Sequence, residues 1–341
     1  MSAVSASPVW NPVSMPEPGL TIGHLATRAA GIAVRALLRE AEAGPKPGLV
    51  DRVGPGVHTD MDISHFRLSA AVLKPFFASI TLESALFMAG ITQTRQDEAD
   101  DSAGLAETLR NLGLEAESAM LAATGGVNTH KGAIWTIGLL CAAIGARMGS
   151  RSKAITGFPQ PPAPDLFNAE AVCAQAAVLA QAILTAGGIP GTAIRTIPLP
   201  GVTTKGLAAR QAYGLRTARD EALEGFPSIR AGALSLARSL RNSTVPEDGK
   251  VISVLLAVMR RADDTCIVAR GGLPALRMAQ SSASQVLDCG GPHSKAGSIL
   301  YRTMVADFKE GFLSPGGSAD LCAATLFLAE MEAEGWPQEN R

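Results

Sequence analysis

Residues 124–132 place several chemically useful side chains directly before a strongly apolar run. They read Thr-Gly-Gly-Val-Asn-Thr-His-Lys-Gly. The glycine pair that ends at Gly126 lets the backbone turn tightly and approach a ligand closely. Asn128 or Thr129 can cap the helix that follows, and the free N–H groups and positive end of that helix then face a bound anion.

Two side chains in the same segment add chemistry of their own. Lys131 carries a permanent positive charge, and His130 can move a proton near neutral pH. Together with the helix start they form an economical phosphate-binding loop. The spacing is neither the G-x-x-x-x-G-K-[ST] loop nor the dinucleotide fingerprint. A glycine-rich helix cap without a ligand is an equally good interpretation of this segment alone.

A second segment, residues 45–62, is rich in proline, glycine and charge. Its proline and glycine content excludes regular structure and predicts a long loop. Long loops inside compact domains are usually functional or disordered. Three acids beside lysine, arginine and histidine favour function, and the candidates are Lys46, Asp51, Arg52, His58, Asp60 and Asp62. The alternative is a solvated loop in which Asp62 caps the next helix, although Asp62 can be both cap and ligand.

Two further segments place acids or glycines at predicted helix ends. Asp263 and Asp264 follow a predicted helix at 250–262 and precede Arg270 within an Arg-Gly-Gly sequence. Acids at a helix C-terminus oppose the helix dipole, so a metal or phosphate site is indicated, with a solvated acid pair as the alternative. Residues 314–320, Ser-Pro-Gly-Gly-Ser-Ala-Asp, form another glycine-rich start to a helix.

The elements that must position these loops are predicted to be helices. Apolar residues recur at helical spacing, alanine and leucine dominate, and neither strands nor internal repeats are evident. The sequence predicts an all-α fold: a single globular bundle of roughly ten helices over residues 20–336, with a disordered extension at 1–19. The predicted helices are 21–43, 63–80, 83–90, 104–122, 130–147, 168–186, 205–223, 228–242, 250–262, 296–309 and 319–334. Helix 130–147 should be central, because it is apolar nearly all round.

Composition excludes several classes of function. With 30 basic and 31 acidic residues and only 4% aromatics, the chain lacks the basic excess and stacking residues of nucleic-acid binders. Five scattered cysteines without a C-x-x-C pair indicate neither a zinc site nor a disulfide framework. Residues 1–19 lack the features of a signal peptide, and apolar stretches of about 15 residues are too short to span a bilayer. We therefore expect a cytoplasmic protein with reduced thiols that binds neither nucleic acid nor membrane.

Three segments together resemble one enzyme family. They are residues 46–52 with 56–62, residues 126–132, and residues 314–321. In this order they look like the motifs of the ATP:dephospho-CoA triphosphoribosyltransferases, and the resemblance covers about residues 25–335. Members of that family make the prosthetic-group precursor of citrate lyase or of malonate decarboxylase. The sequence His-Thr-Asp-Met-Asp at 58–62 looks more like the malonate decarboxylase branch, whereas the match around residues 263–272 and 203–206 is looser.

The resemblance implies transfer of a sugar from ATP. The 2′-hydroxyl of 3′-dephospho-CoA attacks C1′ of the ATP ribose, adenine leaves, and the triphosphate stays on the transferred ribose. The product is then passed to a step that loads an acyl carrier protein. Carboxylates suit such chemistry because they stabilise an oxocarbenium-like sugar and accept the hydroxyl proton. Mg²⁺ is expected with ATP, held by one or two aspartates.

The same resemblance gives a hypothesis for the role of each residue. Asp51 or Asp60 is the base, while His130 holds phosphate or assists the departing adenine. Asp62 and Asp264 are the candidate Mg²⁺ ligands. The remaining positions are expected to bind substrate: Lys46, Arg52, His58, Gly126, Asn128, Lys131, Arg270, Gly316, Gly317 and Asp320. A homodimer is an assembly that the sequence leaves open.

Two other functions remain open at the level of sequence. An all-helical, Mg²⁺-dependent hydrolase that resembles ADP-ribose glycohydrolases would use the same acids with water as acceptor, and would ignore dephospho-CoA. A helical nucleotide- or CoA-binding regulator would bind ATP without releasing adenine, but anion binding alone gives no reason for so many carboxylates. The transferase hypothesis requires Asp51, Lys131 and Asp264 to share one cavity.

Overall fold

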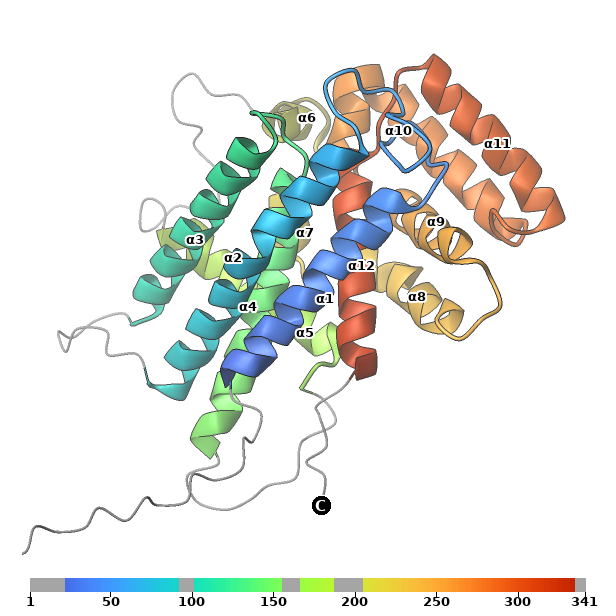
Figure 1. Ribbon diagram of the computed structural model, residues 1–341. Coiled ribbons are helices and arrows are strands. Elements are labelled where there is room, and N and C mark those ends of the chain that lie inside the picture. The colour runs from blue at the N-terminus through green and yellow to red at the C-terminus, as the bar shows by residue number, and fades with distance from the viewer. Residues whose placement is uncertain (1–21, 92–100, 155–165, 187–204, 335–341) are drawn as a thin grey trace, which may run out of the picture.

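The computed structural model describes residues 22–91, 101–154, 166–186 and 205–334. Within these ranges the chain forms α-helices and one short π-helix and no strand, which confirms the all-α prediction (Figure 1). The helices are α1 Ile22–Glu42, α2 Ile63–Ala89, α3 Asp101–Ala123, α4 Lys131–Ala154, α5 Ala169–Ala186, α6 Lys205–Tyr213, α7 Ala218–Leu223, η1 Ile229–Ala233, α8 Leu234–Leu240, α9 Glu247–Met259, α10 Thr265–Asp288, α11 Lys295–Glu310 and α12 Gly316–Glu334. The predicted extension at 1–19 lies outside the described residues.

Helix α4 is the central helix of the bundle, as its all-round apolar sequence predicts. Helices α2, α3, α5 and α12 all pack against it. Its side chains Ile137, Leu140 and Ile144 are completely buried. Burial of this helix on every side holds its N-terminal end, which carries His130 and Lys131, in a fixed place relative to the neighbouring helices.

Two glycines explain why α4 and α2 lie so close together. A Cβ atom added at Gly145 would lie 2.0 Å from the carbonyl oxygen of Thr81, and one at Gly149 would lie 2.0 Å from that of Ala85. Backbone contact of this kind is open only to glycine. The two glycines, one helical turn apart, therefore fix the register of α4 against α2.

Three of the predicted helices differ from the observed ones for identifiable reasons. Helix α2 is continuous where two helices were predicted, and it tolerates Pro75 in its interior. The predicted helix 205–223 is divided into α6 and α7 by Gly214, whose φ is +67°. Helix α10 was not predicted, because Arg-Gly-Gly at 270–272 reads as a break, and Gly272 does kink the helix with φ +70°.

Among the described residues, two helices are long and apolar enough to cross a membrane, so the expectation that all apolar stretches are too short is wrong on length. They are α2 and the part of α4 at Lys131–Ser150, each with a mean hydropathy of 1.4 in its best window. In α4, 83% of that window is buried inside the protein, compared with 33% in α2. A buried core helix passes the same test, so these helices are weak evidence for a membrane span.

The loops singled out by sequence meet at one end of the bundle. In Figure 1 the end of α1 and the starts of α2, α4 and α12 lie at the upper end, beside α10 and α11. The segment 43–62 joins α1 to α2 there without forming a helix. Its His58 Nε2 lies 2.9 Å from the Ser314 hydroxyl at the start of α12. This end of the bundle is where a site can form.

Gly145→Ala is expected to destabilise the protein by about 1–3 kcal/mol, because the new methyl group overlaps the α2 backbone. Gly113→Ala is the matched control: it also replaces a helical glycine, but a Cβ there meets nothing within 4 Å. This control should be neutral or stabilise by about 0.5–1 kcal/mol. Urea unfolding measures both changes, and equal stability of the two variants would contradict the close α2–α4 contact.

Candidate active site

A buried ion pair organises the loop that follows α1. The Lys46 ammonium donates to the Glu40 carboxylate and to the Glu40 carbonyl oxygen, both at 2.6 Å. The two side chains are only 1% and 5% exposed. The Asp51 carboxylate accepts backbone N–H groups from Lys46 at 2.7 Å, Val53 at 2.7 Å and Gly54 at 3.1 Å. Asp51 is therefore committed to holding this loop in its shape.

Asp320, in the first turn of α12, lies against the start of α4. A Cβ atom at Gly132 would fall 2.0 Å from the Asp320 Oδ2 atom, so only glycine allows this approach. The backbone N–H of Ala133 donates to the Asp320 carboxylate. Burial, together with the nearby Glu40 and Asp264 carboxylates, raises the pKa of Asp320 well above its usual value. Asp320 is thus a carboxyl group that accepts protons more readily than an ordinary aspartate.

Asp264 ties the start of α10 to the start of α12. Its Oδ1 accepts the backbone N–H groups of Cys266 at 2.9 Å and Ile267 at 3.2 Å. Its Oδ2 accepts from both the backbone and the hydroxyl group of Ser318, each at 2.7 Å. Burial raises the pKa of Asp264 despite these bonds. Because four donors surround the carboxylate, its main effect is to position two helix starts.

His130 is a buried and neutral imidazole. Its Nδ1 lies 2.6 Å from the Ser69 hydroxyl, and the Phe66 ring packs edge-on at 5.1 Å. Burial, and secondarily the charge of Lys46, lowers the pKa of His130 to about 3. Its Nε2 has no hydrogen-bond partner among the described residues. The side chain can thus offer one nitrogen to a ligand, but not a positive charge at neutral pH.

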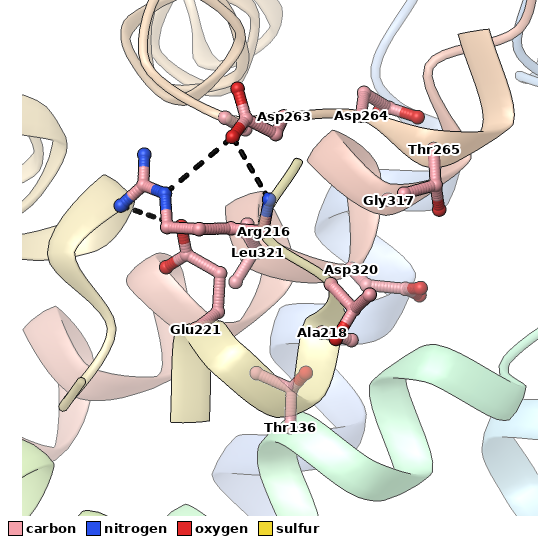
Figure 2. Close-up of a pocket in the computed structure, with 12 residues that line it drawn as sticks. Thr136, Arg216, Ala218, Glu221, Asp263, Asp264, Thr265, Gly317, Asp320 and Leu321 are labelled. Carbon is pink, nitrogen blue, oxygen red and sulfur yellow. Dashed lines mark hydrogen bonds and ion pairs between the residues drawn. The ribbon is translucent and has the colours of Figure 1, made fainter. Parts of the chain in front are cut away.

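A cavity of about 50 Å³ opens beside Asp264 and Asp320. Figure 2 shows the side chains gathered around it, and they come from four segments of the chain. Its polar lining combines acids, hydroxyl groups and one guanidinium, from residues Thr136, Arg216, Thr217, Glu221, Asp263, Asp264, Thr265 and Asp320. A volume of this size holds a few waters or a small polar group, and the surrounding acids favour a group that carries positive charge.

Arg216 is the basic side chain of this cavity. Its backbone N–H donates to Asp263 at 3.1 Å, and its guanidinium lies 3.5 Å from Glu221 (Figure 2). Glu221 is buried and accepts hydrogen bonds from Ser228, and burial raises its pKa. Neither Arg216 nor Glu221 is among the site residues predicted from sequence, and the structure leaves their side chains only 31% and 5% exposed. The available signal was Gly214, which breaks the helix just before Arg216.

Several predicted residues come together in or beside this buried cluster. Lys46, Asp51 and His130 lie on the side of α1 and α4, while Asp264 and Asp320 line the cavity. Gly317 also lines it, next to the Asp264 carboxylate, and Gly316 precedes it beside Cys266. The cluster, here called the acidic cluster, is defined by Glu40, Lys46, Asp51, Asp264 and Asp320.

Other predicted residues lie at the edge or face solvent. Arg52 forms an ion pair with Asp248 and remains 49% exposed. The Asp60 side chain is 64% exposed, 3.8 Å from His58. Asp62 caps α2, and hydrogen bonds led by that from Ser64 lower its pKa to about 2. Roles for these residues remain predictions.

The glycine-rich segment before α4 behaves chiefly as a cap. Asn128 Oδ1 accepts the Lys131 backbone N–H at 3.2 Å, and Gly126 has a φ of +92°. Lys131 is 57% exposed and pairs with Glu117 on α3. Arg270 donates to the Phe312 carbonyl oxygen at 3.0 Å. Of the three residues that the sequence hypothesis required to share one cavity, only Asp264 lines the cavity beside Asp320. Asp51 holds the loop after α1 instead, and the Lys131 side chain pairs with Glu117.

Within the described ranges, no group of three or more His, Cys, Asp or Glu side chains is placed to hold a metal ion. This does not decide the question for Mg²⁺, which binds proteins through one or two carboxylates and takes its other ligands from phosphates and water. The oxygens of Asp62 and Asp264 already accept hydrogen bonds from neighbouring groups. Asp320, with one backbone donor, has more free acceptor capacity.

Comparison with known proteins identifies relatives along almost the whole chain. A family model described as ATP:dephospho-CoA triphosphoribosyl transferase matches residues 26–338. A probable 2-(5″-triphosphoribosyl)-3′-dephosphocoenzyme-A synthase of Azotobacter vinelandii is 39% identical over 308 residues, covering 90% of this chain and 92% of the relative. The synthase of that name from Klebsiella pneumoniae is 35% identical, covering 89% and 96%. No solved structure gives a significant match.

Lys46→Met is expected to destabilise the protein by about 3–5 kcal/mol, because it leaves the Glu40 carboxylate buried without a partner. Burial raises the pKa of Glu40, and Lys46 opposes that rise. Without Lys46, the pKa of Glu40 in the folded state should be raised further. The free energy of unfolding should therefore fall further as the pH rises through the raised pKa of Glu40.

Urea unfolding at pH 5 and pH 8 measures this effect. The double variant Lys46→Met/Glu40→Gln should recover part of the loss and show a weaker pH dependence, because no charge is stranded. Equal losses at both pH values in the single and double variants would refute the buried ion pair as their cause.

Proposed function

Because the chain belongs to the ATP:dephospho-CoA triphosphoribosyl transferase family, we propose that it transfers the triphosphoribosyl group of ATP to the 2′-hydroxyl of 3′-dephospho-CoA and releases adenine. The observation that carries this proposal is the meeting of the three family-like motifs. Lys46 comes from the first, Gly132 from the second and Asp320 from the third. Gly132 and Asp320 are in contact. Lys46 forms an ion pair with Glu40, and the charge of Glu40 acts on Asp320.

Asp320 is the best-placed general base for the acceptor hydroxyl. A base needs a free oxygen and a pKa near the working pH. Asp51 accepts three backbone N–H groups and Asp264 accepts four hydrogen bonds, whereas Asp320 has one backbone donor and a raised pKa. Asp51 and Asp60 remain the bases proposed from sequence, and the geometry favours Asp320 over both.

In the proposed step the proton of the 2′-hydroxyl passes to Asp320 while its oxygen bonds to C1′ of the ATP ribose. The bond from C1′ to adenine breaks, and its electron pair leaves with adenine, which is protonated from water. The acids around the cavity stabilise the positive charge that develops on the sugar. His130 is neutral in the free protein, so its proposed contribution is a hydrogen bond from or to Nε2.

The triphosphate requires cationic partners and backbone donors. Arg216 lines the cavity, and the positive dipole ends of α4 and α12 lie at the same end of the bundle (Figure 1). We also propose that Mg²⁺ accompanies ATP, with Asp263 at the cavity as a protein ligand better suited than Asp62 or Asp264, whose oxygens accept more hydrogen bonds. When bound, the ion would neutralise phosphate charge.

Finer assignments are also proposals. The sequence His-Thr-Asp-Met-Asp at 58–62 supports the malonate decarboxylase branch, with the citrate lyase branch as the alternative. We propose that the product is passed to a step that loads an acyl carrier protein, that the protein works in the cytoplasm, and that a homodimer is one assembly to test. A hydrolase of the ADP-ribose glycohydrolase type would release adenine or ribose without dephospho-CoA.

Incubation of the protein with ATP, Mg²⁺ and dephospho-CoA should yield adenine and one new product in equal amounts. The mass of the product should equal that of dephospho-CoA plus the triphosphoribosyl group, because the phosphates remain on the sugar. Chromatography for adenine and mass spectrometry for the product test this. Adenine release that is the same without dephospho-CoA indicates the hydrolase, and ATP binding without adenine release indicates the regulator.

Asp320→Asn should lower kcat/KM for adenine release by about a hundredfold or more, the usual loss when a general base is removed. Asp307→Asn, an exposed acid on α11, is the control and should leave the rate unchanged. In the wild type, kcat/KM should rise with pH through the raised pKa of Asp320, since only the deprotonated carboxylate accepts the proton. A wild-type rate and pH profile in Asp320→Asn would exclude it as the base.

A further inference from the structure

A second cavity, larger than the first, lies beside Pro45 in the segment that follows α1. Its volume is about 320 Å³, and it shares no lining residue with the cavity beside Asp320. Pro45 forms one wall, the start of α9 a second, and the start of α11 a third. We call it the arm groove. Its main lining is apolar, from Pro45, Pro246, Ile252 and Pro292, with His293 and Arg302 as basic residues.

The basic side chains of the arm groove are not neutralised. Arg302 and His293 make no ion pair with the described residues. The nearest acids in sequence to this wall, Glu247 and Asp248 in the first turn of α9, are already paired with Arg39 and Arg52. A positively charged rim above an apolar floor suits a ligand that has an anionic end and an uncharged chain.

The arm groove and the acidic cluster are coupled through two consecutive residues. Tyr301, from the groove wall, donates its hydroxyl hydrogen to the Pro45 carbonyl oxygen at 2.6 Å. The next residue, Lys46, forms the buried ion pair with Glu40. Burial, and secondarily the Asp51 and Asp248 carboxylates, raises the pKa of Tyr301. A ligand that passes this segment can therefore contact both sites.

The proposed acceptor has the shape that these two sites require. Dephospho-CoA must place its 2′-hydroxyl at Asp320, and its pyrophosphate and pantetheine arm then extend away from the ribose. The cavity beside Asp320, at about 50 Å³, is too small to hold the pantetheine arm. The arm groove, at about 320 Å³, lies in the size range of small-molecule sites.

We propose that the arm groove binds the pantetheine arm of dephospho-CoA, with Arg302 and His293 facing the phosphate end of that arm. The identity of this ligand rests on the proposed function. The apolar floor contacts the methyl groups and methylenes of the arm, and Ser298 offers a hydroxyl group to its amides. The arm groove thereby selects a CoA-type acceptor, while the acidic cluster carries out the transfer.

Calorimetric titration with 4′-phosphopantetheine tests the arm groove without any need for catalysis. The wild type should bind it, and Arg302→Glu should weaken binding at least tenfold, because it reverses the charge at the phosphate end. Arg277→Glu is the matched control: it reverses an exposed arginine on α10 whose side chain bonds only to Gln280. Equal affinity in all three proteins, or no binding by the wild type, would overturn the proposal.

Two further probes separate the parts of the ligand. Ser298→Phe fills the arm groove and should abolish binding of both 4′-phosphopantetheine and unphosphorylated pantetheine, while thermal unfolding confirms that the variant is folded. Inorganic phosphate should bind far more weakly than 4′-phosphopantetheine. Phosphate affinity equal to that of the whole arm would mean that the arm groove is an anion site only, and would overturn the assignment of the arm.

Kinetics place the arm groove in the reaction. Arg302→Glu should raise the KM for dephospho-CoA about tenfold, which corresponds to a loss of ~1.4 kcal/mol of acceptor binding. The KM for ATP and the kcat should stay within about twofold of the wild-type values. A change in the KM for ATP instead would contradict the proposal. If the wild type binds 4′-phosphopantetheine but releases no adenine, the proposed function fails while the arm groove stands.

Discussion

The buried ion pair between Lys46 and Glu40 is the interaction on which the rest of the site depends. It fastens the loop after α1 to the last turns of that helix, in a place where neither charge reaches water. A pair of this kind is costly to break, because the remaining charge would be buried alone. It also sets the electrostatics nearby: the Lys46 charge helps keep His130 neutral, and the Glu40 carboxylate helps keep Asp320 hard to ionise.

Negative charge is in excess around this pair. Glu40, Asp51 and Asp264 are buried carboxyl groups, and the partly buried Asp320 lies near Glu40 and Asp264, whereas Lys46 is the one lysine of the cluster. The folded protein balances the excess with backbone N–H donors at helix starts and with raised pKa values. Such a site gains when a positively charged species enters it, which is the electrostatic condition for stabilising a cationic sugar during transfer.

The sequence predicts the fold class and the meeting of its motifs better than the role of each residue. Periodicity finds most helices, and α10 is missed because Gly271, Gly272 and Pro274 look like breakers although the helix continues through a kink. Which lysine is buried depends on tertiary packing, so Lys46 and Lys131 look alike in sequence but differ completely in exposure. Arg216 is missed for the same reason, since its pattern resembles a solvated face until α6 and α7 separate.

The contact between Gly132 and Asp320 joins residues that lie far apart in the chain, so it has a consequence for the order in which the site can form. Gly132 at the start of α4 is synthesised before Asp320 of α12. A growing chain therefore contains the start of α4 before it contains the carboxylate that packs against it. Helices α1, α2 and α4 pack against one another through contacts that do not involve α12, whereas the acidic cluster is incomplete without Asp320. The contact between Gly132 and Asp320 therefore forms only when α12 docks against α4.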